Sequence, residues 1–286
     1  MQFGISSHVL LQQRLHPSHL DAFVSAGAHH IELFAARHHF DYTDRVQVKE
    51  IATWFRSSSI RPSLHQPIDA EPRWTRHSAP TLNLVSPDKF RRIEAQDEIK
   101  RALETAEQIP FTTLTLHLGL AHDAWDDSTL EHCLTTVEHL KAFAGPLGVK
   151  LLLENLYNEV ATPSHLLSIL KIGHFDTVNV AFDLGHAHLA PNQPLDGILP
   201  ALETLGKRIT TIHLHDNDAH TDQHLWPFTQ EKSGIAWSSI LPKLPTNIPA
   251  LVEIAHDPPL AIETITKHFT TTVDTFRRLK DATRSI

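Results

Sequence analysis

Short apolar runs along this chain repeatedly end in a histidine or a carboxylate. The ends are His65, His117, Glu154, Asp183, His186, His213 and Glu253, and Asp222 and His224 follow just downstream of one of them. These side chains are ligands of divalent metals in proteins. Groups so far apart in the sequence form one site only if the fold brings the ends of all the strands together. The pattern therefore predicts a barrel and a metal site at the same time.

The apolar runs themselves predict eight strands. They cover residues 2–6, 30–34, 60–65, 113–117, 150–155, 178–183, 209–215 and 250–255. Apolar, β-branched runs of this length are typical of parallel strands that are buried on both faces. Helix-like segments lie between them, and eight alternations of strand and helix predict a closed barrel. We expect an α/β chain that folds as one single-domain (β/α)₈ TIM barrel over residues 1–286.

Helix boundaries are predicted from capping residues. Ser86 and Pro87 predict the start of one helix, Thr162 and Pro163 the start of another that Gly173 ends, and Gly145 the end of a third. The first of these helices is expected to bury an apolar face. That face comprises Phe90, Ile93, Ile99, Leu103 and Ala106.

An open, doubly wound sheet is the alternative fold. Such a sheet usually carries a glycine-rich first turn, whereas this chain has 10 glycines and no GxGxxG or GxxxxGK[ST] after a strand. Nucleotide cofactors are therefore not expected. The longest irregular stretch, residues 66–85, follows the third predicted strand, which places it on the face where barrel enzymes bind substrate. Its length predicts a lid.

Composition excludes several classes of protein. The net charge of −8 disfavours a protein that coats nucleic acid. The lone Cys133 excludes an internal disulfide and a cysteine-based zinc site, and it fits a reducing compartment. No signal peptide is predicted from the N-terminal residues MQFGISSH, and no run approaches the roughly 18 apolar residues of a membrane helix. We expect a cytoplasmic protein without a membrane partner; its oligomeric state is not predicted.

Several segments together resemble the xylose isomerase-like barrels, a family that includes sugar isomerases and epimerases, inosose dehydratases and endonuclease IV. The segments are HIELFAARHHFDY, LHQP, NLVSPD, TLHLG, LLLEN, FDLGHAH, IHLHDN, DQH and VEI, and they span nearly the whole chain. In relatives that bind one ion, the matching ligands are Glu154, Asp183, His213 and Glu253. In relatives that bind three, His65 and His117 join Glu154 around a second ion, and His186, Asp222 and His224 hold a third.

The resemblance implies a sugar isomerase or epimerase. One divalent ion, and at most three, would be manganese, zinc, cobalt or magnesium, and it would orient a carbohydrate-like substrate and stabilise an enediolate. Glu154 and Glu253 would transfer protons, and His186 would contact a substrate oxygen. Trp226 and Phe228 are predicted to wall the pocket. Arg37, His39 and Asp41 are weaker candidates for polar contacts. A dehydratase or lyase would use the same chemistry with a different leaving group.

Two other functions remain open at this point. A zinc phosphodiesterase acting on abasic DNA would use the same ligands, but it needs a basic groove. Arg73 and Arg76 are the candidates for that groove, and Asp69 and Glu71 lie beside them. Nucleic acid is therefore not the expected partner. A barrel that binds a small molecule without converting it would leave the ligand cluster incomplete in space.

Overall fold

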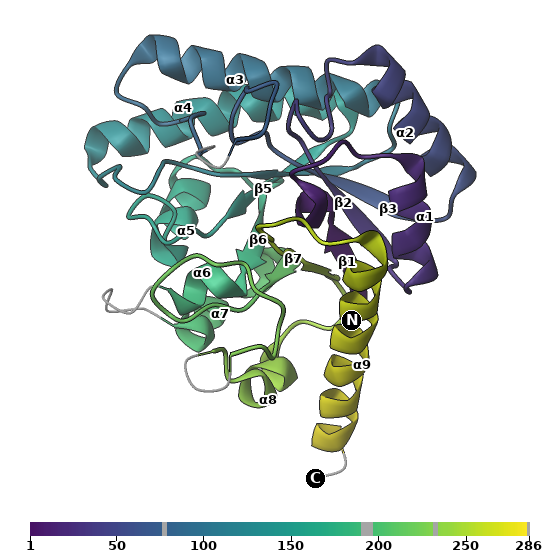
Figure 1. Cartoon of the computed structure of the whole chain (residues 1–286). Coiled ribbons are helices and arrows are strands. Elements are labelled where there is room, and N and C mark those ends of the chain that lie inside the picture. Colours follow the sequence, from purple (N-terminus) through teal and green to yellow (C-terminus); the bar gives the residue numbers. More distant parts are fainter. Residues whose placement is uncertain (76–78, 190–196, 231–233, 285–286) are drawn as a thin grey trace.

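In the computed structural model, which describes residues 1–75, 79–189, 197–230 and 234–284, eight parallel strands close into a barrel (Figure 1). The strands are β1 (Gln2–Ser6), β2 (His30–Phe34), β3 (Arg61–His65), β4 (Thr113–Leu116), β5 (Lys150–Glu154), β6 (Asn179–Asp183), β7 (Ile209–Leu214) and β8 (Pro249–Val252). Strand β1 pairs with both β2 and β8, and this pairing closes the ring. The predicted TIM barrel is confirmed, and the open-sheet alternative is wrong.

The strand boundaries follow the apolar runs closely. Strands β1 and β2 have the predicted bounds, whereas β8 begins at Pro249 and ends at Val252. Glu253 consequently lies one residue beyond its strand, although its backbone N–H still donates to Leu214 in the neighbouring strand at 3.1 Å. This bond keeps the carboxylate at the rim of the barrel.

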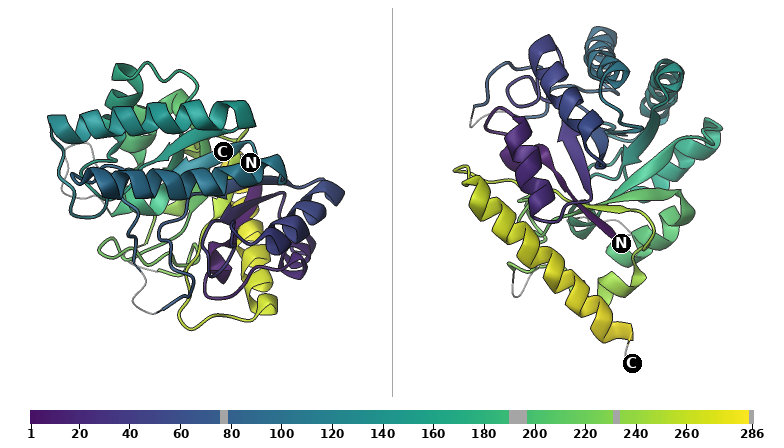
Figure 2. Two further views of the ribbon diagram at one scale, coloured as in Figure 1. Left: turned by 90° about the horizontal axis from the view of Figure 1, so that it is seen from above. Right: turned by 90° about the vertical axis from the view of Figure 1, so that its right-hand side faces the viewer.

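Helices surround the barrel on the outside (Figure 2). They are α1 (Pro17–Ser25), α2 (Arg45–Ser57), α3 (Lys89–Glu104), α4 (Asp127–Ala144), α5 (Pro163–Ile172), α6 (Leu184–His188), α7 (Ile198–Leu205), α8 (Trp237–Ile240) and α9 (Ile262–Arg284). The last helix, α9, lies against the first, α1, and Phe276 of α9 stacks on Phe3 of β1 with ring centroids 5.5 Å apart. Within the described residues, no helix has both the length and the apolarity to span a bilayer.

The predicted ends of α4 and α5 are confirmed, but the start of α3 was predicted wrongly. Asp88 is the N-cap, and its carboxylate accepts the N–H of Phe90 at 2.8 Å, so the helix begins two residues later than we predicted. The predicted apolar face was also too long. Phe90 is 78% exposed and Ile93 is 42% exposed, because the first turn of α3 does not pack on the barrel. Ile99 and Leu103 are buried as predicted.

Candidate metal centre

The carboxyl ends of the strands bring the predicted ligands to one face of the barrel. Glu154, Asp183, His213 and Glu253 form one group, in which ligand atoms lie within 4.8 Å of one another. His65, His117 and Glu154 form a second such group. His186, Asp222 and His224 belong to a third, which His215 joins. The structure thus brings together all nine residues that the sequence singled out as ligands.

The central group is built around the imidazole of His213. Its Nδ1 lies 2.9 Å from Glu253 Oε2, 3.0 Å from Glu154 Oε1 and 3.9 Å from Asp183 Oδ2. Asp183 Oδ2 and Glu253 Oε2 are buried and accept no hydrogen bond from the described residues. Buried polar atoms are nearly always satisfied, so two such oxygens in one group are the kind of donor that a cation could bind.

The second group shares Glu154 with the first. Glu154 Oε2 lies 2.9 Å from His117 Nε2 and 3.4 Å from His65 Nε2, and the two imidazole nitrogens are 3.1 Å apart. Glu154 therefore directs one oxygen at each group. A carboxylate placed in this way is suited to bridging two cation positions.

In the third group, Asp222 lies between two histidines. Its Oδ2 is 3.3 Å from His186 Nε2, and its Oδ1 is 3.4 Å from His224 Nε2. The ring of His215 stacks on His224 with centroids 3.8 Å apart and planes 11° apart. An ion cannot lie in both of two parallel ring planes, so these two rings do not hold the same ion in this arrangement. His215 Nε2 instead lies 3.0 Å from Asp183 Oδ1.

The local sequence DLGHAH explains how Asp183 is held. Asp183 caps α6, where its Oδ1 accepts the N–H of His186 at 2.6 Å. The side chain of Asn155 donates to the carbonyl of Asp183 and accepts its N–H, at 2.9 and 2.8 Å. Gly185 leaves room for His215, because a Cβ at this position would lie 1.9 Å from the ring. These contacts engage Oδ1 and leave Oδ2 free.

Four histidines share one tautomer signature, in which Nδ1 lies at hydrogen-bonding distance from a backbone carbonyl. The pairs are His65 with Gln66 (2.9 Å), His186 with Asn155 (3.0 Å), His224 with Glu253 (3.1 Å) and His8 with Ile254 (3.0 Å). A carbonyl oxygen only accepts, so each Nδ1 carries the proton. In the neutral ring, Nε2 is then unprotonated and carries a lone pair, and a nitrogen in this state can bind a metal.

The electrostatics of the cluster favour ionised carboxylates. Burial acts to raise the pKa of Glu154, but His213 and His117 outweigh it and hold the pKa well below its usual value. Burial likewise acts to raise the pKa of Asp222, but His224 and His186 outweigh it and hold the pKa well below its usual value. The resulting negative field is one that protons or a divalent cation can neutralise.

A cavity of 600 Å³ opens above these groups. Glu253, His117, His186, Asp222 and His224 lie in its wall, together with apolar side chains such as Phe34, Leu120 and Leu156. Ile68, Ala79 and Pro80 of the long segment 66–85 also line it, so this segment lies at the mouth as predicted. Whether it acts as a lid stays a prediction. An apolar cavity with convergent polar groups is the usual form of a small-molecule site.

Sequence reasoning missed three residues that belong to this site. His8 lines the cavity and forms a further group with His224 and Glu253; burial lowers the pKa of His8 to about 4. Glu32 is fully buried and lies 3.2 Å from His213 Nε2. Asn155 holds Asp183. Signals for two of them were present in the sequence, because His8 lies two residues beyond the first predicted strand and Glu32 is the one carboxylate within HIELF.

Trp226 and Phe228 do not wall the pocket. The indole N–H of Trp226 donates to His256 at 2.7 Å, and Phe228 packs on Trp237 and Phe276, with the latter ring centroid 4.8 Å away. Neither residue lines the 600 Å³ cavity. Backbone bonds between Asp216 and Leu225 turn this segment toward α9, and that turn carries both rings away from the substrate side.

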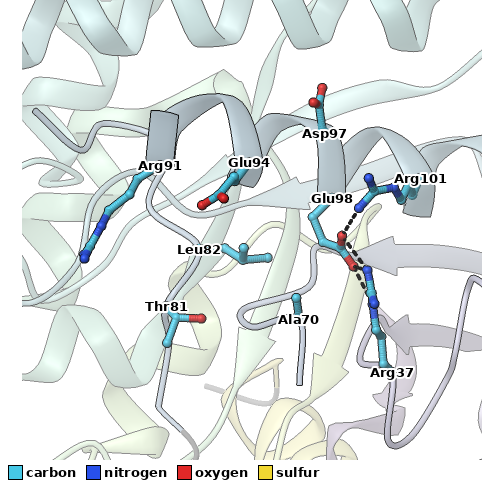
Figure 3. Close-up of a pocket in the computed structure, with 9 residues that line it drawn as sticks. All are labelled: Arg37, Ala70, Thr81, Leu82, Arg91, Glu94, Asp97, Glu98 and Arg101. Carbon is cyan, nitrogen blue, oxygen red and sulfur yellow. Dashed lines mark hydrogen bonds and ion pairs between the residues drawn. The ribbon is translucent and has the colours of Figure 1, made fainter. Parts of the chain in front are cut away.

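The weaker candidates also have structural partners. Arg37 lines a different cavity of 690 Å³ and pairs with Glu98 of α3 (Figure 3). His39 is buried, with Nδ1 2.6 Å from the carbonyl of Gln13, and Asp41 accepts bonds from Thr43. None of the three lines the cavity above the ligands. Arg73 is exposed, and Arg76 lies outside the described residues.

The residues present fit a divalent cation. The unsatisfied oxygens of Asp183 and Glu253 and the Nε2 atoms of the anchored histidines supply oxygen and nitrogen ligands. Such a set, without thiolate, suits zinc, manganese, cobalt or magnesium.

Comparison with known proteins identifies the family whose sequence model matches this chain. The sequence model of the family described as Xylose isomerase-like TIM barrel matches residues 20–247. Uncharacterized protein MJ1311 of Methanocaldococcus jannaschii is 26% identical over 241 residues, which cover 79% of this chain and 74% of that protein.

Two solved structures are similar in fold. A D-tagatose 3-epimerase-like protein superposes with a TM-score of 0.69 and 22% identity, over 96% of this chain and 99% of the other. The IOLI protein with a binding zinc atom superposes with a TM-score of 0.75 and 16% identity, over 96% and 98%. At these identities the likeness establishes the fold.

Proposed function

This chain belongs to the xylose isomerase-like TIM barrel family, and from that premise we propose that it is a divalent-metal-dependent isomerase or epimerase. Its substrate would be a sugar, a sugar phosphate or a related polyol. One observation carries the proposal: the unsatisfied oxygens of Asp183 and Glu253 belong to one ligand group, and Glu253 lines a 600 Å³ cavity together with the anchored His186 and His224. The similar structures, an epimerase-like protein and a zinc-bound one, support it.

The proposed ligands of the principal ion are Glu154, Asp183, His213 and Glu253. When bound there, a divalent ion supplies a Lewis acid that polarises a carbonyl oxygen and lowers the cost of negative charge beside it. The buried side chains hold this position away from bulk water, because Asp183 and His213 are fully buried. In such an environment, electrostatic stabilisation is stronger than in water.

Glu253 is the better placed of the two proposed proton-transfer groups. It lines the cavity, whereas Glu154 lies beneath the wall with one oxygen directed at His213 and the other at His117. Burial acts to raise the pKa of Glu253, but His213 outweighs it and holds the pKa well below its usual value, so the group is an ionised carboxylate. We assign proton abstraction to Glu253 and chiefly ion binding to Glu154.

Two other groups in the wall are suited to binding substrate oxygens. His8 presents Nε2 as an acceptor, because its Nδ1–H donates to Ile254. His117 lies with its side chain partly exposed, at 21%. We assign both to contacts with substrate hydroxyl groups.

The proposal is tested with the purified protein in two steps. Elemental analysis measures bound divalent metal, and ketoses and their phosphates are then screened for exchange of hydrogen for deuterium beside the carbonyl. Exchange that depends on added metal and is lost in Asp183→Asn supports the proposal. Absence of both metal binding and exchange over the whole panel would refute it. The assay also detects a dehydratase or lyase, since these share the first proton abstraction.

A phosphodiesterase is the second candidate, and the number of ligand groups favours it. The groups flanking the central one match the three-ion arrangement that the sequence predicted for endonuclease IV-like relatives. The cavity wall argues for a small polyol instead, because among the described residues it contains no lysine or arginine. Incision of duplex DNA with an abasic site, at catalytic amounts of enzyme and dependent on zinc, would place this candidate first.

A further inference from the structure

A polar layer lies inside the barrel, beneath the ligands. The interior of such barrels is normally filled by branched apolar side chains. Here Glu32 of β2, Ser63 of β3, Thr115 of β4 and His213 of β7 meet, each 2% exposed or less. Glu32 Oε2 lies 3.4 Å from Ser63 Oγ and 3.3 Å from Thr115 Oγ1, and both hydroxyls donate to it.

The buried carboxylate of Glu32 needs a donor or a charged partner for each of its oxygens. Burying an ionised carboxylate without a partner costs several kcal/mol. Across the described ranges, the one ion pair of Glu32 is with His213, whose Nε2 lies 3.2 Å from Glu32 Oε1. Both atoms are buried and neither makes a hydrogen bond to any described residue, so the 3.2 Å contact between them is the closest polar pairing that the structure gives to either. Glu32 Oε1 is therefore directed at the imidazole of His213.

His213 faces in two directions. Its Nδ1 is directed at the carboxylates of the central group, and its Nε2 at Glu32. A histidine binds a metal through a lone pair, so Nδ1 must be unprotonated and the proton must be on Nε2. This arrangement is the reverse of that in His65, His186 and His224, where a backbone carbonyl fixes the proton on Nδ1.

We propose that Glu32 is a positioning residue that accepts the Nε2–H of His213 and so directs Nδ1 at the cation position. Carboxylates behind metal-binding histidines act in this way, by fixing the tautomer and orientation of the ring. Ser63, which donates to Glu32, is held in turn by the half-buried His30, because Nε2 of His30 lies 2.9 Å from Ser63 Oγ. Glu32 is therefore part of a chain of side-chain contacts. This inference rests on the proposed cation site and adds a residue that none of the ligand groups includes.

The test compares Glu32→Gln with the wild type and with Glu98→Gln, a matched substitution of another buried glutamate. Zinc affinity is measured by competition with a chromophoric chelator, and cobalt is used as a spectroscopic probe. We expect Glu32→Gln to weaken zinc binding by about 10- to 100-fold, the usual effect of losing such a partner, and to shift the cobalt d–d bands. Glu98→Gln should leave both unchanged.

A second measurement needs no variant. Nitrogen-15 spectra of the zinc-loaded wild type should show His213 with its proton on Nε2. The proposal is overturned if His213 carries its proton on Nδ1, or if Glu32→Gln binds zinc as tightly as the wild type with the same cobalt spectrum. A wild type that binds no divalent ion would refute the proposed function as well, so the two failures are distinguishable.

Discussion

Two clusters of buried charge on this barrel differ in what they leave unpaired. Around Glu98, both carboxylate oxygens are fully used: Arg37 donates from Nε and Nη2 at 2.7 Å, and Arg101 donates at 2.5 Å (Figure 3). The hydroxyl of Tyr42 donates to the same carboxylate. In the central group, Asp183 and Glu253 each keep a buried oxygen without a donor. The first cluster ties α3 to the loop after β2. The second has capacity left for a ligand, and this difference distinguishes a site from a structural ion-pair network.

The largest expected effect comes from Asp183→Asn, which removes one charge from the central group. Losing an outer partner of a metal site typically costs about 10- to 100-fold in affinity or activity, and losing a ligand should cost more. We expect turnover to be abolished and bound metal to be lost, with the far-UV circular dichroism of the wild type. Glu98→Gln is the control and should keep its metal. Equal metal content in Asp183→Asn and the wild type would show that Asp183 is not a ligand, and the contrast between the central group and the Glu98 cluster would then be wrong.

Removing the metal should destabilise the protein. A ligand at about 1,000 times its Kd stabilises the folded state by about 4 kcal/mol. Chelation should therefore lower Tm by on the order of 10 °C for a domain of this size. The same shift is expected in Glu98→Gln, because that cluster does not contribute to the cation site. A Tm that does not respond to chelator or added zinc would contradict a buried cation site.

Substitution of Glu98 should lower the stability of the folded protein without changing metal binding at the central group. Hydrogen bonds to charged groups contribute about 1.5–3 kcal/mol, so Glu98→Gln should cost about 2 kcal/mol in the free energy of unfolding, measured in urea. Burial acts to raise the pKa of Glu98, but Tyr42 and Arg37 outweigh it, and the pKa lies below its usual value.

The sign of this pKa shift predicts a pH dependence. The stabilisation by Glu98 is fully present above the ordinary glutamate pKa of about 4.5 and is lost as the pH falls through the lower pKa of the folded protein. The difference in stability between wild type and Glu98→Gln should therefore shrink on acidification below about pH 4.5. A difference that grows over this range would mean that the Glu98 pKa is not depressed.

The smallest expected effect is that of Trp226→Phe. The change removes the hydrogen bond to His256 and keeps an aromatic ring in the packing, so it should cost about 1 kcal/mol of stability. KM should not change, because Trp226 does not line the cavity. A large rise in KM with unchanged stability would restore the pocket-wall role that the sequence suggested.

The sequence predicted what depends on strand periodicity and strand ends. The barrel and the gathering of Glu154, Asp183, His213 and Glu253 follow because a closed parallel sheet places all its carboxyl ends on one face. The start of α3 was missed because Ser86 and Asp88 are both good caps, and a pattern cannot choose between them.

The positions of two side chains could not be predicted from the sequence pattern. The position of Trp226 depends on backbone bonds between Asp216 and Leu225, which no local signal encodes. Glu32 was overlooked because a single charge within an apolar strand looks like an exposed residue until the strand is known to face the barrel interior.

Adjacent ligand groups share members: Glu154 belongs to two of them, Glu253 to two and His224 to two. We therefore expect cations bound at neighbouring groups to be thermodynamically coupled. An ion that takes a shared side chain, or that brings its own charge close by, changes the affinity of the next position, and by linkage the effect is mutual. Stoichiometry alone would then describe this centre incompletely, since successive ions would bind with unequal constants.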